Sequence, residues 1–227
     1  MISQSYCTLT TSLYSFQVYM ARQKELRGFL VKISFQGELG SYSHQACCEA
    51  FPDAQPLPCP TFEGAMEKAK GGESKYAIIP VENSTYGRIA DIYYLLPESG
   101  LFIIKEHFLR VHINLLALPG VSIREVKLAM SHSVLLGQCR KFLAKNNIKG
   151  VSGVDTAGSA KLVSQSQDRT KAALASPLAG QIYGLESLVE EVEDMSNNTT
   201  RFLVMSNNSE ENDVADKKQF MTTIVFQ

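Results

Sequence analysis

Strand-like and helix-like patterns alternate along most of this chain, and this alternation restricts its fold more than any other feature. The first strand pattern is Val31–Phe35, where apolar and polar residues alternate as in a half-buried strand. A loop with Gly37 and Gly40 follows, and a helical pattern around His44 comes next. Repeated strand–loop–helix units are typical of α/β proteins, so we expect an α/β fold.

The individual elements are predicted from residue spacing and from capping residues. Thr61 is placed to cap a helix that the pair Gly71–Gly72 ends. The apolar run at residues 76–81 is typical of a buried parallel strand. Apolar residues at helical spacing between residues 135 and 143 predict one continuous helix, whereas residues 185–188 are expected to be a connection. The other expected strands are residues 101–105, 111–118, 126–130, 148–154, 171–175 and 202–205.

These patterns fall into two groups, which we interpret as two α/β lobes with a cleft between them. The first lobe is predicted to comprise residues 30–110 together with residues 190–206, because the strand that ends the second range is expected to return to it. Residues 111–189 are expected to form the second lobe. Residues 1–29 are interpreted as an N-terminal extension, and residues 207–227 as a linker and a terminal strand.

Both ends of the chain differ in composition from its interior. The first 20 residues contain no Lys or Arg, which argues against a secretory signal or a transit peptide, and Met20 is an alternative start to Met1. Residues 206–218 are acidic and polar, as linkers are. The alternating stretch Phe220–Phe226 is expected either to join an existing sheet or to be the first strand of a further domain.

Charge and cysteine content argue against several classes of partner and site. The formal net charge of −1 gives no electrostatic basis for binding nucleic acid or an anionic membrane, and no apolar run is long enough to span a bilayer. The five cysteines include no C-x-x-C motif, which favours a reducing compartment over a disulfide framework or a zinc site. We therefore expect a cytoplasmic protein with no metal, no nucleic acid and no membrane partner.

Four junctions between predicted strands and neighbouring loops or helices carry polar side chains. Strand ends of two α/β lobes converge on the cleft between them, so we expect these side chains to lie close together. Neutral donors, helix N-termini and one guanidinium suit a small polyanion such as a dicarboxylate. The candidate binding residues are Asn83, Ser84, Ser131, Gln138, Asp155, Thr156, Thr200 and Arg201.

Several of these residues also have a plainer interpretation. Asn83 is equally typical of a turn and Gln138 of a helix surface, whereas Asp155 is more typical of a helix cap than of a general acid. His132, between two serines, is the best candidate among four scattered histidines. The chain contains no Ser/His/Asp order, H-E-x-x-H or Walker loop, and its first glycine loop lacks the spacing of a nicotinamide site. The residues alone therefore predict a small-anion site between two lobes and leave the reaction open.

Seven short motifs occur along residues 35–202. They are FQGELGSYS at 35–43, PVENS at 80–84, SH at 131–132, GQC at 137–139, DTAGSA at 155–160, YGL at 183–185 and NTTRF at 198–202. Each motif is weak alone, but together and in this order they are specific. On these motifs the chain resembles the prephenate dehydratase family, to which the arogenate dehydratases are closely related.

This resemblance implies two lobes of the periplasmic-binding-protein type II kind, with the active site in the cleft between them. It implies a lyase that removes carbon dioxide and the ring hydroxyl from prephenate, without a cofactor, and yields phenylpyruvate for phenylalanine biosynthesis. Thr200 is expected to be the catalytic residue, donating a hydrogen bond to the leaving hydroxyl. Arg201 is expected either to hold a substrate carboxylate or to be a structural ion-pair partner. The other expected substrate contacts are Asn83, Ser84, Ser131, Gln138, Asp155 and Thr156.

Members of this family usually continue into an ACT-type domain that binds phenylalanine. Residues 222–226 resemble the first strand of that domain, so we expect it to be truncated here and the chain not to respond to phenylalanine. Homo-oligomerisation stays open. Two alternatives to prephenate dehydratase also stay open, namely an arogenate dehydratase that gives phenylalanine directly and a non-catalytic two-lobe module that binds a small anion.

Overall fold

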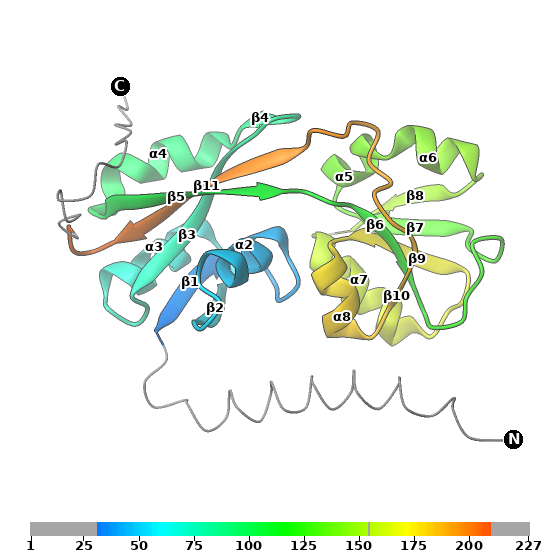
Figure 1. The fold of residues 1–227 in the computed structure, drawn as a ribbon, viewed down its shortest axis with the longest axis horizontal. Coiled ribbons are helices and arrows are strands. Elements are labelled where there is room, and N and C mark those ends of the chain that lie inside the picture. The colour runs from blue at the N-terminus through cyan, green and yellow to red at the C-terminus, as the bar shows by residue number, and fades with distance from the viewer. Residues whose placement is uncertain (1–30, 154, 210–227) are drawn as a thin grey trace, which may run out of the picture. The chain divides into compact units, whose positions relative to one another are not determined.

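The computed structural model describes residues 31–153 and 155–209 and shows the expected mixture of helices and strands (Figure 1). The strands form two sheets, so the predicted α/β class is confirmed. The extension over residues 1–29 and the strand expected at Phe220–Phe226 lie outside the described residues. No helix within the described ranges combines the length and apolar character that a membrane crossing needs.

The first sheet is mixed, with strand order β2-β1-β3-β11-β5 and β4 paired to β3. β1 runs parallel to β2 and β3, whereas β11 runs antiparallel to β3 and β5. The expected parallel pairing of residues 76–81 therefore holds on one side of β3 only. The strands are β1 (Lys32–Gln36), β2 (Gln55–Cys59), β3 (Tyr76–Asn83), β4 (Gly87–Arg88), β5 (Phe102–Arg110) and β11 (Thr199–Ser206).

Three helices, α2 (Tyr42–Ala50), α3 (Phe62–Lys70) and α4 (Ala90–Ser99), cover this sheet. Thr61 caps α3 by accepting a hydrogen bond from the Gly64 N–H, as predicted. Alternate side chains of β3 point to opposite faces. As a result Ile78 packs with α2 in one core cluster, and Ile79 packs with α3 and α4 in another.

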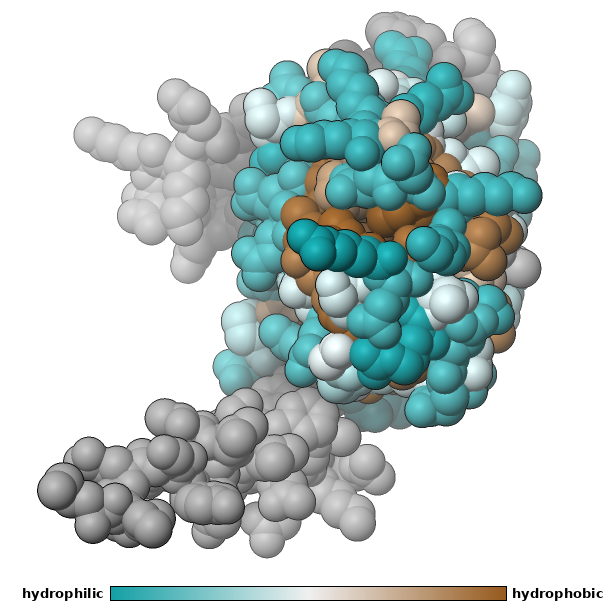
Figure 2. Space-filling model, turned by 90° about the vertical axis from the view of Figure 1, so that its right-hand side faces the viewer, coloured by the Kyte–Doolittle hydropathy of each residue, from teal (hydrophilic) through white to brown (hydrophobic). Residues whose placement is uncertain are grey.

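The second sheet has strand order β10-β6-β9-β7-β8. β7 runs parallel to β8 and β9, and β6 runs antiparallel to β9 and β10. Figure 2 shows the side of the molecule that carries this sheet and its helices, with polar side chains over most of the surface and apolar atoms in a central band. The strands are β6 (Asn114–Ala117), β7 (Leu128–Ser131), β8 (Lys149–Ser152), β9 (Lys171–Ala175) and β10 (Glu186–Val189), and the helices are α5 (Ser133–Gln138), α6 (Arg140–Lys145), α7 (Thr156–Ser166) and α8 (Pro177–Tyr183).

The prediction of a single helix between residues 135 and 143 is wrong, because the chain forms two helices that meet at Cys139. Cys139 has φ −120° and ψ 22°, which is not helical. Asp194 lies at the break: its backbone N–H donates to the Gln138 carbonyl at 2.7 Å, and its carboxylate accepts from the Lys141 N–H at 3.2 Å. Hydrogen bonds from another segment thus satisfy backbone groups that one continuous helix would have paired internally.

The prediction of a connection at residues 185–188 is also wrong, because Glu186–Val189 forms β10 at the edge of the second sheet. β2 was not predicted either. It contains Pro56 and Pro58, which interrupt a strand pattern, and it lies at the edge of the first sheet, where a strand tolerates proline.

The chain passes between the sheets twice, at residues 111–113 and at residues 190–198. We call these segments the first and second crossings. They are hydrogen bonded to each other, because Val111 N–H donates to the Asn198 carbonyl at 2.9 Å and Val192 N–H donates to the Ile113 carbonyl at 2.8 Å.

The loop after β1 also contacts the second sheet's helices. The hydroxyl of Ser176, which caps α8, donates to the Gly40 carbonyl at 2.6 Å, and the Tyr183 hydroxyl donates to the Leu39 carbonyl at 2.8 Å. Gly40 has φ +89°, and a Cβ added to it would lie 2.9 Å from the Ala179 Cα. Glycine is therefore needed here both for the backbone conformation and for the close approach of α8.

Candidate active site

Thr200 and Asn83, which are 117 residues apart, meet because β11 pairs with β3. The register places Thr200 opposite Asn83. The Asn83 Nδ2 donates to the Thr200 Oγ1 at 3.0 Å, and Thr200 is buried. Strand pairing thus brings together the amide and the hydroxyl that the sequence singles out.

The orientation of the Asn83 amide is set by hydrogen bonds at both ends. Its Oδ1 accepts from the backbone N–H groups of Thr85 and Tyr86, each at 2.9 Å. Its Nδ2 donates to the Asn198 Oδ1 at 2.7 Å as well as to Thr200. An amide has two donor hydrogens and two lone pairs on its oxygen, so every hydrogen-bonding position of Asn83 is used. Asn83 is therefore a turn residue and also a partner of Thr200.

The Thr200 hydroxyl accepts a hydrogen bond but has no protein acceptor for its own hydrogen among the described residues. A hydroxyl can accept and donate at the same time. Accepting from Asn83 polarises the O–H bond and makes it a better donor. The side chain is thus prepared to donate a hydrogen bond to a bound molecule.

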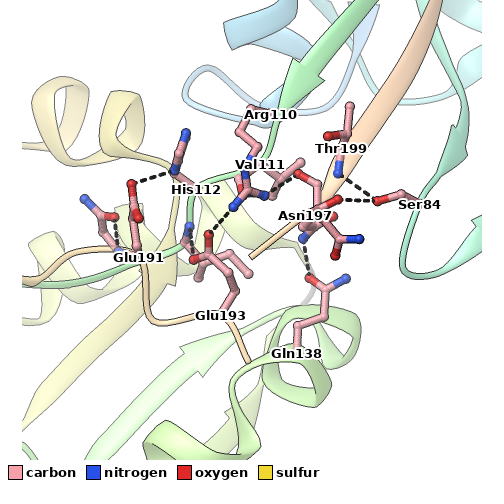
Figure 3. A network of polar contacts seen from close by, with 12 residues as sticks. Ser84, Arg110, Val111, His112, Gln138, Glu191, Glu193, Asn197 and Thr199 are labelled. Carbon is pink, nitrogen blue, oxygen red and sulfur yellow. Dashed lines mark hydrogen bonds and ion pairs between the residues drawn. The ribbon is translucent and has the colours of Figure 1, made fainter. Parts of the chain in front are cut away.

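Gln138 is linked to this pair through Asn198. The Asn198 Nδ2 donates to the Gln138 Oε1 at 3.1 Å, and Figure 3 shows the Gln138 side chain beside the two crossings. Gln138 is the last residue of α5 rather than an early residue of a longer helix. The hydroxyl at 200 and the amides at 83 and 138 therefore belong to one chain of hydrogen bonds.

Ser84 links the end of β3 to the start of β11 through hydrogen bonds to backbone groups. Its Oγ donates to the Asn197 carbonyl at 2.8 Å and accepts from the Thr199 N–H at 3.0 Å. The Ser84 N–H also donates to the Thr199 carbonyl at 2.9 Å. Figure 3 shows the two contacts of the Ser84 Oγ, and all three contacts fix the start of β11 against the end of β3.

Arg201 follows Thr200 in β11, and consecutive strand residues point to opposite faces. Its guanidinium is hydrogen bonded and ion paired to the Glu106 carboxylate of β5, through Nε at 3.1 Å and through Nη2. Both side chains are mostly buried, with 23% and 17% exposed. The structure thus shows the ion pair that the sequence interpretation offered as the alternative for Arg201.

Ser131 ends β7 of the second sheet, whereas Asp155 and Thr156 lie at the start of α7, and no hydrogen bond among the described residues joins any of the three to Thr200. The Ser131 hydroxyl is buried and donates to the Leu174 carbonyl at 2.7 Å. Asp155 caps α7 by accepting from the Gly158 N–H at 2.6 Å, and Thr156 is the first residue of that helix. The cap interpretation of Asp155 is therefore confirmed.

Three residues of the network were not predicted as site residues, namely Asn198, Arg110 and Glu193. The Arg110 Nη1 donates to the Asn198 carbonyl at 2.7 Å, and its Nη2 lies 3.4 Å from the Glu193 Oε1. The Glu193 Oε2 accepts from the Ile113 N–H at 3.0 Å (Figure 3). Asn198 opens the NTTRF motif, which was a usable signal, but Arg110 and Glu193 belong to no motif.

Burial disfavours ionisation of several groups around this region. It lowers the pKa of His44 to about 4 and raises the pKa values of Cys47 and Cys139 to about 12. Burial, followed by the nearby Cys139 and Glu193, holds the Tyr42 pKa well above its ordinary value. His132, the preferred histidine, caps α5 through its Nδ1. The described part of the chain contains no group of three or more His, Cys, Asp and Glu side chains arranged to hold a metal ion.

The sequence and the structure both have recognisable relatives. Residues 33–210 match the sequence profile of the family described as prephenate dehydratase. The bifunctional N-acyl-homoserine lactone acylase/prephenate dehydratase of Komagataeibacter europaeus is 41% identical over 174 residues, which are 77% of this chain and 62% of the relative. Arogenate dehydratase/prephenate dehydratase 1, chloroplastic, of Arabidopsis thaliana is 40% identical over 78% of this chain and 45% of its own length. The chain thus spans about half to three fifths of these relatives.

Two solved structures share this fold. A protein described as GqqA, a novel type of quorum quenching acylase, superposes with a TM-score of 0.74 and 40% identity, over 79% of this chain and 65% of the other. Prephenate dehydratase from Arthrobacter aurescens in complex with L-Phe superposes with a TM-score of 0.73 and 28% identity, over 79% of this chain and 61% of the other. Because the family profile covers more than half of its residues, this chain belongs to the prephenate dehydratase family.

Proposed function

We propose that this chain catalyses the decarboxylating dehydration of prephenate to phenylpyruvate, with Thr200 as the catalytic residue. One observation supports this most. The Thr200 hydroxyl accepts a hydrogen bond from Asn83 and keeps its own hydrogen available among the described residues. A donor of this kind is what a leaving hydroxyl requires.

The reaction breaks two bonds of the substrate. The electron pair of the ring C–O bond leaves with oxygen as hydroxide, which takes up a proton from solvent and becomes water. The C–C bond to the departing carboxylate breaks at the same time, and its electrons complete the aromatic ring as carbon dioxide leaves. The change is redox neutral, so we propose that this carbon–oxygen lyase works without a cofactor. The protein then mainly has to stabilise negative charge that develops on the leaving oxygen.

Thr200 supplies this stabilisation as a hydrogen-bond donor. A fixed hydrogen-bond donor in a site that excludes water stabilises a developing anion far more than a donor in bulk water does. Asn83 keeps the hydroxyl oriented, because its donated hydrogen occupies a lone pair of the Oγ1. We assign Gln138, Ser131, Ser84 and the α7 start at Asp155–Thr156 to substrate binding, and Arg201 to the ion pair with Glu106.

Prephenate and arogenate differ only in the keto or amino group of the side chain, and this group takes part in neither of the bonds that break. The same Thr200 chemistry therefore serves either substrate. Prephenate is our first proposal and arogenate the second, and both names occur among the chain's relatives.

The test is to incubate the purified chain with prephenate and with arogenate in parallel and to follow phenylpyruvate by its absorbance in alkali and phenylalanine by chromatography. We expect formation of phenylpyruvate that depends on the amount of protein. Binding of prephenate without turnover would instead indicate the non-catalytic module. A third incubation, with an N-acyl-homoserine lactone, tests the other activity in the name of the Komagataeibacter europaeus relative.

A further inference from the structure

We infer that Asn198 is a positioning residue, which holds the Asn83 amide and, through it, the Thr200 hydroxyl in the reactive orientation. The inference rests on the proposed function for its kinetic consequence, but its structural part can be measured without any activity. Asn198 is not expected to touch the substrate, because it acts through its contact with Asn83.

The Asn198 side chain is buried and bridges two elements. Only 1% of the residue is exposed. Its Oδ1 accepts from the Asn83 Nδ2 at 2.7 Å, at the end of β3, and its Nδ2 donates to the Gln138 Oε1 at 3.1 Å, at the end of α5. Rotation of this amide would break both contacts and leave buried polar atoms unpaired, which is unfavourable.

The backbone of Asn198 is held as firmly as its side chain. Its carbonyl accepts from the Val111 N–H at 2.9 Å and from the Arg110 Nη1 at 2.7 Å. Arg110 is held in turn by Glu193 of the second crossing, whose side chain is 3% exposed. The Cα of Asn198 is therefore fixed relative to both crossings, and the side chain extends from an anchored point.

The chemistry of the bridge suits asparagine in particular. The position needs an acceptor toward Asn83 and a donor toward Gln138 in one planar group, and an amide supplies both. Alanine supplies neither. Aspartate keeps the acceptor toward Asn83 but loses the donor, and the Gln138 amide can turn to present its own NH₂ group instead.

Loss of the acceptor at 198 frees one hydrogen of the Asn83 Nδ2 from its partner. The Asn83 amide then has fewer constraints, and its second hydrogen is less often aligned with the Thr200 Oγ1. A misaligned donor weakens stabilisation that is strongest in the transition state, so kcat falls while KM is largely kept.

The experiment compares Asn198→Ala with Asn114→Ala. Asn114 is a matched control, since it is a 3% exposed asparagine whose amide also makes two contacts near the crossings, with the Ser187 Oγ at 2.9 Å and the Glu191 N–H at 3.1 Å. We expect Asn198→Ala to lower kcat about 10–100-fold with KM changed less than about threefold. Asn114→Ala should leave both constants within about twofold.

A double substitution separates positioning from general damage. If Asn198 acts through Asn83, Asn198→Ala should have little further effect on kcat in the Asn83→Ala background. Additive losses in the double variant, an unchanged kcat in Asn198→Ala, or an effect on KM alone would each overturn the inference. Asn198→Asp keeps the acceptor toward Asn83, so kcat should stay within about fivefold of the parent chain, and a loss as large as in Asn198→Ala would overturn the inference. Asn198→Leu, which removes both amide contacts but keeps nearly the same volume, replaces Asn198→Ala if that protein does not fold and should show the same loss of kcat.

An NMR measurement keeps the inference separate from the proposed function. The side-chain NH₂ hydrogens of Asn83 should exchange slowly with solvent in the parent chain and in Asn114→Ala, and at least about tenfold faster in Asn198→Ala. If the parent chain turns over neither prephenate nor arogenate, the proposed function fails, and this exchange measurement alone decides the positioning role. Equal exchange in the parent chain and Asn198→Ala would overturn it.

Discussion

At Thr200 the neighbouring residues determine what a common side chain can do. The hydroxyl is buried and already accepts from Asn83, and its own hydrogen has no acceptor among the described residues. Arg201, the next residue, is held by Glu106 and points away. The contacts of these two adjacent residues are consistent with a chemical role for Thr200 and a structural role for Arg201.

We expect Thr200→Val to lower kcat at least about 100-fold, because valine keeps the shape and strand preference of threonine but removes the donor to the leaving oxygen. Thr200→Ser keeps the hydroxyl and should retain more activity than Thr200→Val. Steady-state rates with prephenate measure both variants, and Thr199→Val, one residue away, is the control. Near-normal turnover in Thr200→Val, with Thr200→Ser no better, would remove Thr200 from the mechanism.

His44 makes stability depend on pH. Its pKa is about 4 in the folded chain because of burial, below the ordinary value of about 6.5, so between these pH values the unfolded chain binds more protons. The free energy of unfolding is therefore expected to fall as the pH is lowered through this window. The titration of His44 alone should lower it by about 2 kcal/mol between pH 7 and pH 5. Urea unfolding at both pH values measures it.

The variant His44→Gln should lose this part of the pH dependence, since glutamine does not titrate and can still accept from the Gly40 N–H as the His44 Nδ1 does. His112→Gln, at a partly exposed histidine paired with Glu191, is the control. An unchanged pH dependence in His44→Gln would show that burial of this histidine does not govern acid stability.

At the scale of elements, the local residue pattern correctly predicted helices and strands whose residues favour that structure by themselves. The helix capped by Thr61 and the strand Lys171–Ala175 appear as expected. β2 was missed because its two prolines oppose a strand locally and are tolerated only through its edge position. The break at Cys139 was missed because it depends on Asp194, 55 positions along the chain.

The Arg201–Glu106 ion pair is expected to stabilise the pairing of β11 with β5 rather than substrate binding. Glu106→Gln should lower the free energy of unfolding by about 1–3 kcal/mol, because the pair is mostly buried and hydrogen bonded. KM for prephenate should stay unchanged. Glu73→Gln, which removes a more exposed pair with Lys68, should destabilise the chain less than Glu106→Gln does. A raised KM for prephenate in Glu106→Gln would indicate that Arg201 binds the substrate.

The loop after β1 offers a test of its contact with α8. Gly40→Ala should destabilise the chain more than Gly72→Ala, by about 1–3 kcal/mol. Both glycines have positive φ, +89° and +77°, but a Cβ at 40 meets the Ala179 Cα at 2.9 Å whereas a Cβ at 72 meets nothing within 4 Å. Thermal unfolding of the two variants measures the difference. Equal destabilisation would mean that backbone strain alone matters at Gly40.

At the scale of the whole described chain, the site residues that could not be predicted from the sequence are those that meet only through long-range pairing. The class of fold and the Thr200 and Asn83 candidates follow from motifs and strand patterns, and the structure joins these two residues. Asn198, Arg110 and Glu193 were missed as a group because they meet only when the two crossings pair. No local pattern encodes a contact between two residues that are 88 positions apart.

The two crossings have a consequence for how the protein is made. β11 lies between β3 and β5 in the first sheet, yet it follows every strand of the second sheet along the chain. On the ribosome, the second sheet can therefore be complete while the first still has a gap at its centre. The nascent chain acquires both its Thr200–Asn83 pair and its finished first sheet only when Thr199–Ser206 leaves the exit tunnel.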